Sequence, residues 1–448
     1  MFRQLSVATR HPQLRLAPRS TISRLSSSPS IIMTRKQSGT STVGPMLAHE
    51  DSLPGLPIPT IQSTAEKYLE TTRPHLTPSE FRTTQLAVNE FISSPLVRRL
   101  QTRLEERAVS EKSQGKNNWL IEWWNDIAYM SYRDPVVVFV SYFYVHLAGE
   151  QGKGRDLRAA ELLKGLLLFR DLVESQKLEP EKIKDYPLAM NSYKWLFNAA
   201  RIPTAGSDTA KKYPADSHNH VVFIRKNRLY EIPVVVNGKQ LSVSELESLI
   251  AKVVAKADKE GTGVPVGVCY ESAQTRKFAM GRTEVIRAAS SESKEWAESM
   301  LSSEKTDSER FTLFKKAVNR HLQYAAWAAD GQGVDRHLFG LKRLLKEGEE
   351  TPRLYEDVAF GRTNKWELST SNLSSKWLDG WGYGEVVPDG YGLSYSIGDG
   401  YIRWTMTCLK DMSRKGKGAK ELKKALEEAA EMVKALLASV AQEPKAKL

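Results

Sequence analysis

The chain has 448 residues, 41% of them apolar and 26% charged, which is enough apolar surface for one large or two ordinary cores and excludes a disordered or fibrous protein. The formal charge of +12 is concentrated at the ends, because residues 1–49 carry seven basic side chains and no acid and residues 414–424 carry six against one, so no basic groove for nucleic acid is expected. Two cysteines, without Cys-x-x-Cys or His-Glu-x-x-His spacing, exclude a disulfide framework and predict no metal site.

Both ends of the chain carry patterns that are typical of targeting segments. The first 45 residues combine seven basic side chains and nine serines with no carboxylate, which is the composition of a mitochondrial presequence, although an unstructured basic tail has the same composition. The last three residues, Ala446-Lys447-Leu448, resemble the peroxisomal Ser-Lys-Leu signal. Because Met33 offers a second start inside the presequence, we expect distribution between mitochondrion and peroxisome.

Helical patterns dominate the region before Pro203. Gly44–Pro59 is expected to form an extended strap, because prolines at 54, 57 and 59 remove backbone donors and fix φ. The apolar run Pro135–Gly149 is about half as long as a membrane span, so it predicts a buried strand or helix, and no transmembrane segment is expected. Apolar residues at helical spacing predict four helices: Thr64–Thr71, Thr77–Ala108 with Pro78 in its first turn, Trp119–Tyr132 and Leu157–Val173.

Strand patterns appear after Pro203. Two β-rich runs, His220–Ile224 and Leu229–Val236, are separated by Arg225-Lys226-Asn227-Arg228, which predicts a hairpin. The remaining sequence alternates irregularly, with helices expected at 243–259, 311–329, 334–346 and 418–440 and strands at 365–369, 391–396 and 401–408. This alternation predicts an α/β or α+β fold.

Three clusters of polar side chains have chemical content, because each groups hydroxyls or places a guanidinium beside them. They are Tyr270-Glu271-Ser272-Ala273 with Gly281-Arg282-Thr283, Asp335-Arg336-His337, and Ser369-Thr370-Ser371-Asn372. The simpler interpretation is capping and turn chemistry, in which Asp335 caps the helix that holds Arg336. A further segment, Val386–Gly392, contains an Asp-Gly pair that is typical of a tight turn.

In this order, these segments resemble the choline/carnitine acyltransferase family, and among its members the carnitine O-acetyltransferases. The resemblance covers nearly the whole chain. Besides the three prolines of the strap, it rests on six segments in family order: Trp119–His146, Met190–Pro203, Tyr270–Ser290, Val334–Leu341, Leu368–Asn372 and Val386–Gly392. It implies an α/β fold with two domains that resemble chloramphenicol acetyltransferase.

The resemblance implies reversible transfer of an acyl group between coenzyme A and the hydroxyl of carnitine, with acyl-coenzyme A as co-substrate and no permanently bound cofactor or metal. Arg336 would pair with the carnitine carboxylate, which choline lacks, and Tyr270 and Thr283 would complete that site. Ser371 would donate to the tetrahedral oxyanion, and Tyr383 would face the trimethylammonium group. The other expected site residues are Ser272 and Ser369, as supporting hydroxyls, and Ala273 and Asn372, near coenzyme A.

Three further properties follow from the same resemblance. We expect a monomer that has no nucleic-acid partner and makes, at most, a peripheral contact with a membrane. Trp381, just ahead of Tyr383, would favour short acyl groups if it borders the acyl pocket. Packing of Trp381 in the core, away from any pocket, is the alternative.

The resemblance fails at the catalytic base. The family places a histidine after a glutamate near the middle of the chain, whereas none of the eight histidines here follows a glutamate. Each of them is expected to be a surface or core residue rather than a substitute base. Residues up to Gly267 resemble a family segment well before that histidine, and residues from Tyr270 resemble one well after it. Between Gly267 and Cys269, a block that holds the histidine, the basic segment for the coenzyme A phosphates and several strands is therefore absent.

This gap divides the expected organisation and leaves two hypotheses. A targeting segment spans residues 1–45, and two truncated acyltransferase domains span residues 46–267 and 268–448. Either the chain is an acyltransferase whose recorded sequence is incomplete, or it is a non-catalytic or unstable product that at most binds a ligand or partner. Missing strands would expose sheet edges and apolar helix faces.

Overall fold

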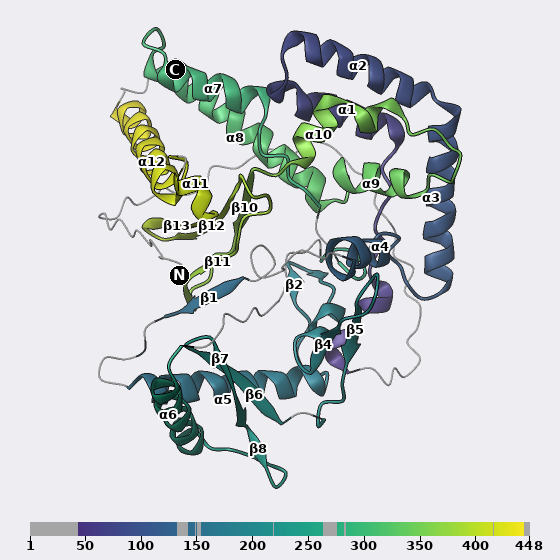
Figure 1. Ribbon diagram of the computed structural model, residues 1–448. Helices are drawn as coiled ribbons and strands as arrows, with labels where there is room; N and C mark the ends of the chain where they lie inside the picture. The colour runs from purple at the N-terminus through teal and green to yellow at the C-terminus, as the bar shows by residue number, and fades with distance from the viewer. Residues whose placement is uncertain are drawn as a thin grey trace.

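The computed structural model describes residues 44–131, 142–147, 149, 154–217, 219–262, 276–281, 284–414 and 416–442. Nearly all of both expected targeting segments lies outside these ranges. Within them, none of the helices combines the length and the apolar content that a membrane span needs. Figure 1 shows a mixed arrangement of helices and small sheets, as the alternating sequence pattern predicts.

The first half of the chain is mainly helical (Figure 1). Its helices are α1 (Ile61–Thr72), α2 (Pro78–Ser93), α3 (Pro95–Ser113), α4 (Ile121–Asn125), which continues into a π-helical turn (Asp126–Met130), α5 (Arg155–Glu174) and α6 (Val243–Glu260). Its strands are short: β1 (Phe143–His146), β2 (Lys182–Ile183), β3 (Tyr186–Pro187), β4 (Ala199–Ile202), β5 (Thr209–Lys212), β6 (His220–Arg225), β7 (Arg228–Pro233), β8 (Val235–Val236) and β9 (Lys239–Gln240). Short 3₁₀ turns lie at Pro45–Leu47, Glu50–Ser52, Arg73–His75 and Asn191–Trp195.

The second half supplies the other helices and the longest strands. The helices are α7 (Ser291–Leu301), α8 (Asp307–Ala329), α9 (Asp335–Arg343), α10 (Val358–Asn364), α11 (Lys410–Arg414) and α12 (Ala419–Gln442). The strands are β10 (Leu368–Asn372), β11 (Leu378–Gly382), β12 (Tyr391–Gly398) and β13 (Tyr401–Thr407), and a 3₁₀ turn lies at Arg353–Glu356. The sequence patterns predicted neither α7 nor β11.

The helix predicted over residues 77–108 is in fact two helices, so this prediction is wrong at one point. Thr77 and Glu80 form a capping box at the start of α2. Ser94 then leaves the helical conformation (φ −62°, ψ 124°), because the residue before a proline is disfavoured there. The Ser94 side chain accepts the Val97 N–H and Pro95 occupies the first turn, so α3 begins at once in a new direction.

The β6–β7 hairpin confirms the turn chemistry of its sequence. Lys226 and Asn227 both have positive φ, 50° and 58°, as a two-residue turn of type I′ requires. The strands pair in register from His220 opposite Pro233 to Arg225 opposite Arg228. By contrast, only the end of the predicted buried run 135–149 lies among the described residues, and β1 there leaves Tyr144 42% exposed.

The sheets are small. The largest in the described part of the chain has three strands in the order β10-β12-β13, with β10 parallel and β13 antiparallel to β12. The other described strands form antiparallel pairs: β1 with β11, β2 with β3, β4 with β5, β6 with β7 and β8 with β9.

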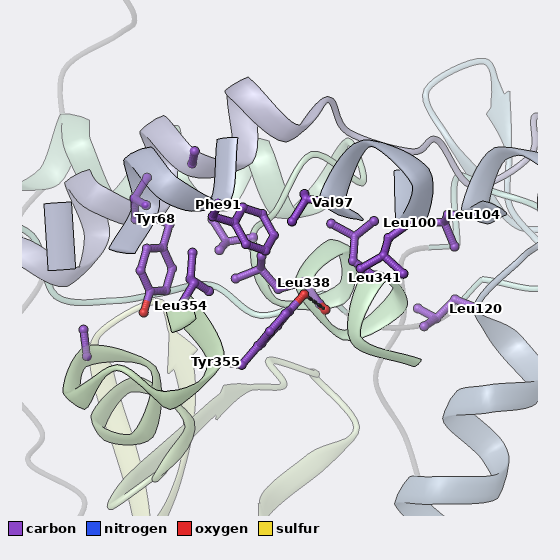
Figure 2. Close-up of a cluster of buried hydrophobic side chains, with 14 of the residues drawn as sticks. Tyr68, Phe91, Val97, Leu100, Leu104, Leu120, Leu338, Leu341, Leu354 and Tyr355 are labelled. Atoms are coloured by element: carbon purple, nitrogen blue, oxygen red, sulfur yellow. Dashed lines mark hydrogen bonds between the residues drawn. The ribbon is translucent and has the colours of Figure 1, made fainter. Parts of the chain in front are cut away.

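Two of the hydrophobic cores in the described part of the chain bear most on the site. We call the larger one the helical core; it gathers buried side chains from α1, α2, α3, α9 and the 353–356 turn, and Figure 2 shows Leu338 and Leu341 of α9 among them. The hydroxyl of Tyr355 donates to the Leu338 carbonyl at 2.9 Å, which fixes α9 in this core. The smaller core packs one face of the β6–β7 hairpin against α5 and α6 through Ile232, Leu163 and Leu246.

Candidate functional site

The start of α9 brings charged side chains into a buried position. Val334 occupies the N-cap position of this helix, and its apolar side chain cannot accept the free N–H groups of the first turn. Asp335 and Arg336 are the first two helical residues. The helical core fixes this end of α9, because Leu338 and Leu341, one and two turns further on, are 2% and 0% exposed.

Arg336 is buried and stacked on an aromatic ring. Its residue is 7% exposed, and the guanidinium carbon lies 3.6 Å from the ring centroid of Trp124 on α4. Burial lowers the pKa of Arg336, and the carboxylate of Glu284 opposes that shift. A buried, oriented guanidinium is suited to hold a carboxylate through paired hydrogen bonds.

Glu284 supplies the helix cap that Val334 cannot. Its carboxylate accepts the backbone N–H of Val285 at 2.8 Å and the backbone N–H of Arg336, the second residue of α9. Gly333 makes this approach possible, because a Cβ at that position would lie 2.4 Å from the Glu284 side chain. Desolvation, together with the charge of Asp335, raises the pKa of Glu284 to about 7 although Arg336 opposes it.

Asp335 does not cap its helix, so that interpretation of the sequence is wrong. The carboxylate instead forms a two-pronged ion pair with Arg287, with nitrogen–oxygen distances of 2.9 and 3.1 Å. Both side chains are 9% exposed. Arg287 also donates to the Thr71 hydroxyl and lies 5.3 Å from the centroid of the Tyr68 ring, so this ion pair joins α9 to α1.

His337 is a core histidine, as expected. Its ring is 1% exposed and hydrogen-bonded at both nitrogens, to Thr64 Oγ1 at 2.7 Å and to Gln101 Oε1 at 2.8 Å. The Gln101 amide nitrogen donates to the Pro59 carbonyl, so its oxygen accepts from His337 Nε2–H, and Nδ1 accepts from Thr64. Burial lowers the pKa of His337 to about 3, so the ring is neutral and ties the strap, α1 and α3 to α9.

Three other expected site residues lie on a different element, β10: Ser371 for the oxyanion, Ser369 in support and Asn372 near coenzyme A. Ser369, Ser371 and Asn372 alternate with their neighbours along this strand; Ser369 and Ser371 are half-buried, whereas Asn372 is exposed. Ser371 lies opposite Ser394 of β12 in the parallel pair. Ser394 Oγ donates to the Trp381 carbonyl at 2.6 Å.

Tyr383 and Trp381 are fixed against these strands by their polar atoms. The Tyr383 hydroxyl donates to the Ser369 carbonyl at 2.7 Å, and burial raises the pKa of this phenol to about 12. Trp381 is 8% exposed, and its indole N–H donates to the Tyr395 carbonyl at 3.2 Å. The two rings lie 5.5 Å apart, centroid to centroid. The Trp381 ring is thus largely buried and bonded to β12, and its effect on acyl length stays a prediction.

Four of the expected site residues, Tyr270, Ser272, Ala273 and Thr283, lie outside the described residues, as do Gly267 and Cys269. Among the described histidines, His146 is an exposed residue of β1, and His321 is an exposed residue of α8. His220 lies on β6, 3.5 Å from the Glu231 carboxylate across the hairpin. No group of His, Cys, Asp or Glu in the described part of the chain is arranged to hold a metal ion.

Glu284, Arg287 and Trp124 were not predicted from the sequence as site residues. Glu284 directly follows Gly281-Arg282-Thr283, and Trp124 lies within the aromatic segment 119–132, so both are in segments that were singled out. Their roles depend on contacts with α9, which is 51 residues after Glu284 and carries no complementary pattern of its own. The absence of a capping side chain at Val334 was the one available indication that an acceptor comes from elsewhere.

Comparison with known proteins gives a consistent result. The family model described as choline/carnitine O-acyltransferase matches two segments, residues 56–269 and 264–428. The mitochondrial carnitine O-acetyltransferase of Saccharomyces cerevisiae is 22% identical over 569 aligned residues, which cover 80% of this chain and 84% of that protein. Human carnitine O-acetyltransferase is 22% identical over 613 aligned residues, which cover 90% of this chain and 95% of that protein. Human peroxisomal carnitine O-octanoyltransferase is 28% identical over 239 aligned residues, which cover 51% of this chain and 38% of that protein.

Proposed function

Since the chain belongs to the choline/carnitine O-acyltransferase family, we propose that it is a carnitine O-acetyltransferase-type protein, in which a short acyl group passes reversibly between coenzyme A and the hydroxyl of carnitine. The observation that carries this proposal is Arg336, a buried guanidinium stacked 3.6 Å from Trp124 at the start of a helix. Carnitine has a carboxylate for this cation to bind and choline has none.

Each expected site residue has a proposed role in binding or catalysis. Arg336 binds the carboxylate, with the hydroxyls of Tyr270 and Thr283 beside it. The Tyr383 ring faces the trimethylammonium group, and its hydroxyl bond to Ser369 would keep that ring in one orientation. Ser371 donates to the oxyanion of the tetrahedral intermediate, with Ser272 and Ser369 in support. Ala273 and Asn372 lie near coenzyme A.

A missing central block is part of the same proposal, and the alignments support it. The 569 positions aligned with the yeast enzyme include 80% of this chain, about 358 residues, and so leave about 210 positions opposite gaps here. The human acetyltransferase alignment gives the same length, because 613 positions include about 403 residues of this chain. The two segments of the family match meet at 264–269, which includes the predicted junction between Gly267 and Cys269.

The same block accounts for the small sheets. Two acyltransferase domains that each lost several strands would retain strand pairs such as β6–β7, whose outer face leaves Val222, Ile224 and Leu229 about half exposed (55%, 48% and 50%). The block would also hold the histidine base and the basic segment for the coenzyme A phosphates. We therefore infer that the chain as written does not turn over.

A second candidate function is carnitine binding without catalysis. It is favoured by the start of α9, where Arg336, Glu284 and the Arg287–Asp335 ion pair are assembled entirely from residues outside the missing block. The names of the relatives, one mitochondrial and one peroxisomal, support both compartments as locations of this chain.

The test compares the chain as written with a chain that has a relative's block of about 210 residues inserted after Gly267. Carnitine-dependent release of thiol from acetyl-coenzyme A should be absent in the first and present in the second. General-base assistance is worth about 10²–10⁴ in rate, and loss of coenzyme A positioning adds to that factor. Turnover by the chain as written, abolished by mutating one of its own histidines, would overturn the proposed deletion. Sequencing the transcript across the codons for Gly267 and Cys269 separates a real deletion from an incomplete record.

A further inference from the structure

Arg336 already has a carboxylate beside it before any ligand binds. Glu284 accepts the backbone N–H of Arg336, and its carboxylate attracts the guanidinium of Arg336, a residue that is only 7% exposed. Asp335, the other acid nearby, is held by Arg287 at 2.9 Å. Glu284 is thus the acid that shares Arg336 with an incoming ligand.

A ligand carboxylate on Arg336 would place a second negative charge next to Glu284. Two ionised carboxylates close together in a desolvated site raise each other's pKa, and one guanidinium cannot compensate both as well as it compensates one. The less costly arrangement keeps one of the two protonated. A carboxylate of carnitine that has just formed paired bonds with a guanidinium resists protonation, so the proton goes to Glu284.

We propose that Glu284 is an internal counter-carboxylate of Arg336 that takes up one proton from solvent when a ligand carboxylate binds, so that binding at this site depends on pH. The proposal rests on the proposed function, because it takes carnitine as that ligand. Glu284 acts here as a positioning residue, since it holds the second N–H of α9 and thereby the backbone that carries Arg336.

The charged groups that face Glu284 come from three elements. Lys67 on α1 and Arg287 on the segment after Glu284 are positive, and α9 contributes both Asp335 and Arg336. Lys67 donates to the Gln332 carbonyl at 2.7 Å, and its charge also interacts with that of Glu284. Desolvation, the main cause, already raises the pKa of Glu284 to about 7, so a further rise of about one unit or more leaves the carboxyl mostly protonated at neutral pH.

Calorimetric titration of the full chain with L-carnitine at pH 7, in two buffers of different ionisation enthalpy, measures the number of protons taken up. A group with a pKa near 7 is half protonated there, so we expect about 0.5 proton per carnitine. The dissociation constant should rise with pH above 7, by up to about tenfold per pH unit. Glu284→Gln should bind without proton uptake and without this pH dependence, whereas Glu284→Asp, which keeps the carboxylate, should retain both.

Glu349→Gln is the matched control. Glu349 also pairs with a single arginine, Arg103 at 2.6 Å, but far from α9's first turn and with its pKa held down to about 2. It should behave as the wild type. Carnitine binding by the wild type with no proton uptake, or unchanged uptake in Glu284→Gln, would overturn the inference and leave the proposed function intact. No carnitine binding at all would overturn the proposed carnitine site and this inference with it. If Glu284→Gln does not fold, Glu284→Asp decides the question, because moving this carboxyl group should shift the pH at which proton uptake is greatest, and an unchanged pH profile would overturn the inference.

Discussion

The helical core around α9 and the hairpin β6–β7 differ in how completely their apolar surface is covered. In the helical core, Leu100, Leu104 and Leu341 are all 0% exposed. In the hairpin, only one face packs on α5 and α6, and no third strand pairs with β6 or β7 among the described residues. A helix satisfies its own backbone, whereas a strand depends on its neighbours. Loss of a central block is therefore expected to damage the strand regions and to leave the Arg336 region assembled.

The first prediction tests whether the Arg336 region keeps a function of its own. In the chain with the block restored, Arg336→Ala should raise KM for carnitine by roughly 30-fold or more and lower kcat much less. The reason is that Arg336 would bind the carboxylate equally in the ground state and in the transition state. The 30-fold figure corresponds to about 2 kcal/mol, which is the usual minimum cost of truncating one partner of a buried charge pair. Steady-state kinetics with carnitine and with acetyl-coenzyme A varied in turn make the measurement.

Arg336→Lys is the control for charge alone. It should recover only part of the affinity, since an ammonium lacks the planar pair of donors and stacks less well on Trp124. An unchanged KM for carnitine in Arg336→Ala would remove this residue from the site.

The second prediction concerns the two regions' contributions to stability. Leu341→Ala in the helical core should lower the free energy of unfolding by about 2–5 kcal/mol, because it leaves a cavity in a fully buried site. Leu229→Ala, on the outer face of the hairpin, should change it by less than about 0.5 kcal/mol. Urea unfolding followed by circular dichroism gives both values. Equal losses would show that the hairpin's outer face is covered in solution.

Most of the helices and the hairpin turn were predictable from sequence because their determinants are local. The capping box of Thr77 and Glu80, the apolar spacing in α6 and the two-residue turn at Lys226-Asn227 each specify their own structure within a few residues. The helix break at Ser94 also has a local cause, which is Pro95. It was not predicted because the helical spacing of apolar residues continues from α2 into α3.

The site was less predictable because its geometry depends on distant segments. Arg336 was found through resemblance to a family, whereas its contacts with Glu284 and Trp124 come from segments 52 and 212 residues away in sequence. Similarly, the order β10-β12-β13, with one parallel pair, follows from tertiary packing that no run of residues encodes.

The last prediction is the smallest and uses His337 to test how the helical core responds to acid. The pKa of this ring falls from its usual 6.5 to about 3 on folding, so the unfolded chain binds the proton more readily than the folded one. The neutral His337 ring makes its full contribution to the free energy of unfolding above about pH 6.5. As the pH falls from 6.5 toward 3, that contribution decreases by at most about 1.4 kcal/mol per pH unit. His337→Gln, which keeps polar atoms for Thr64 and Gln101 but cannot titrate, should be less stable than the wild type at pH 7. Its free energy of unfolding should fall less steeply between pH 6 and pH 4. Parallel slopes for the two proteins would mean that another group controls acid unfolding, and that the strap, α1, α3 and α9 separate without protonation of this histidine.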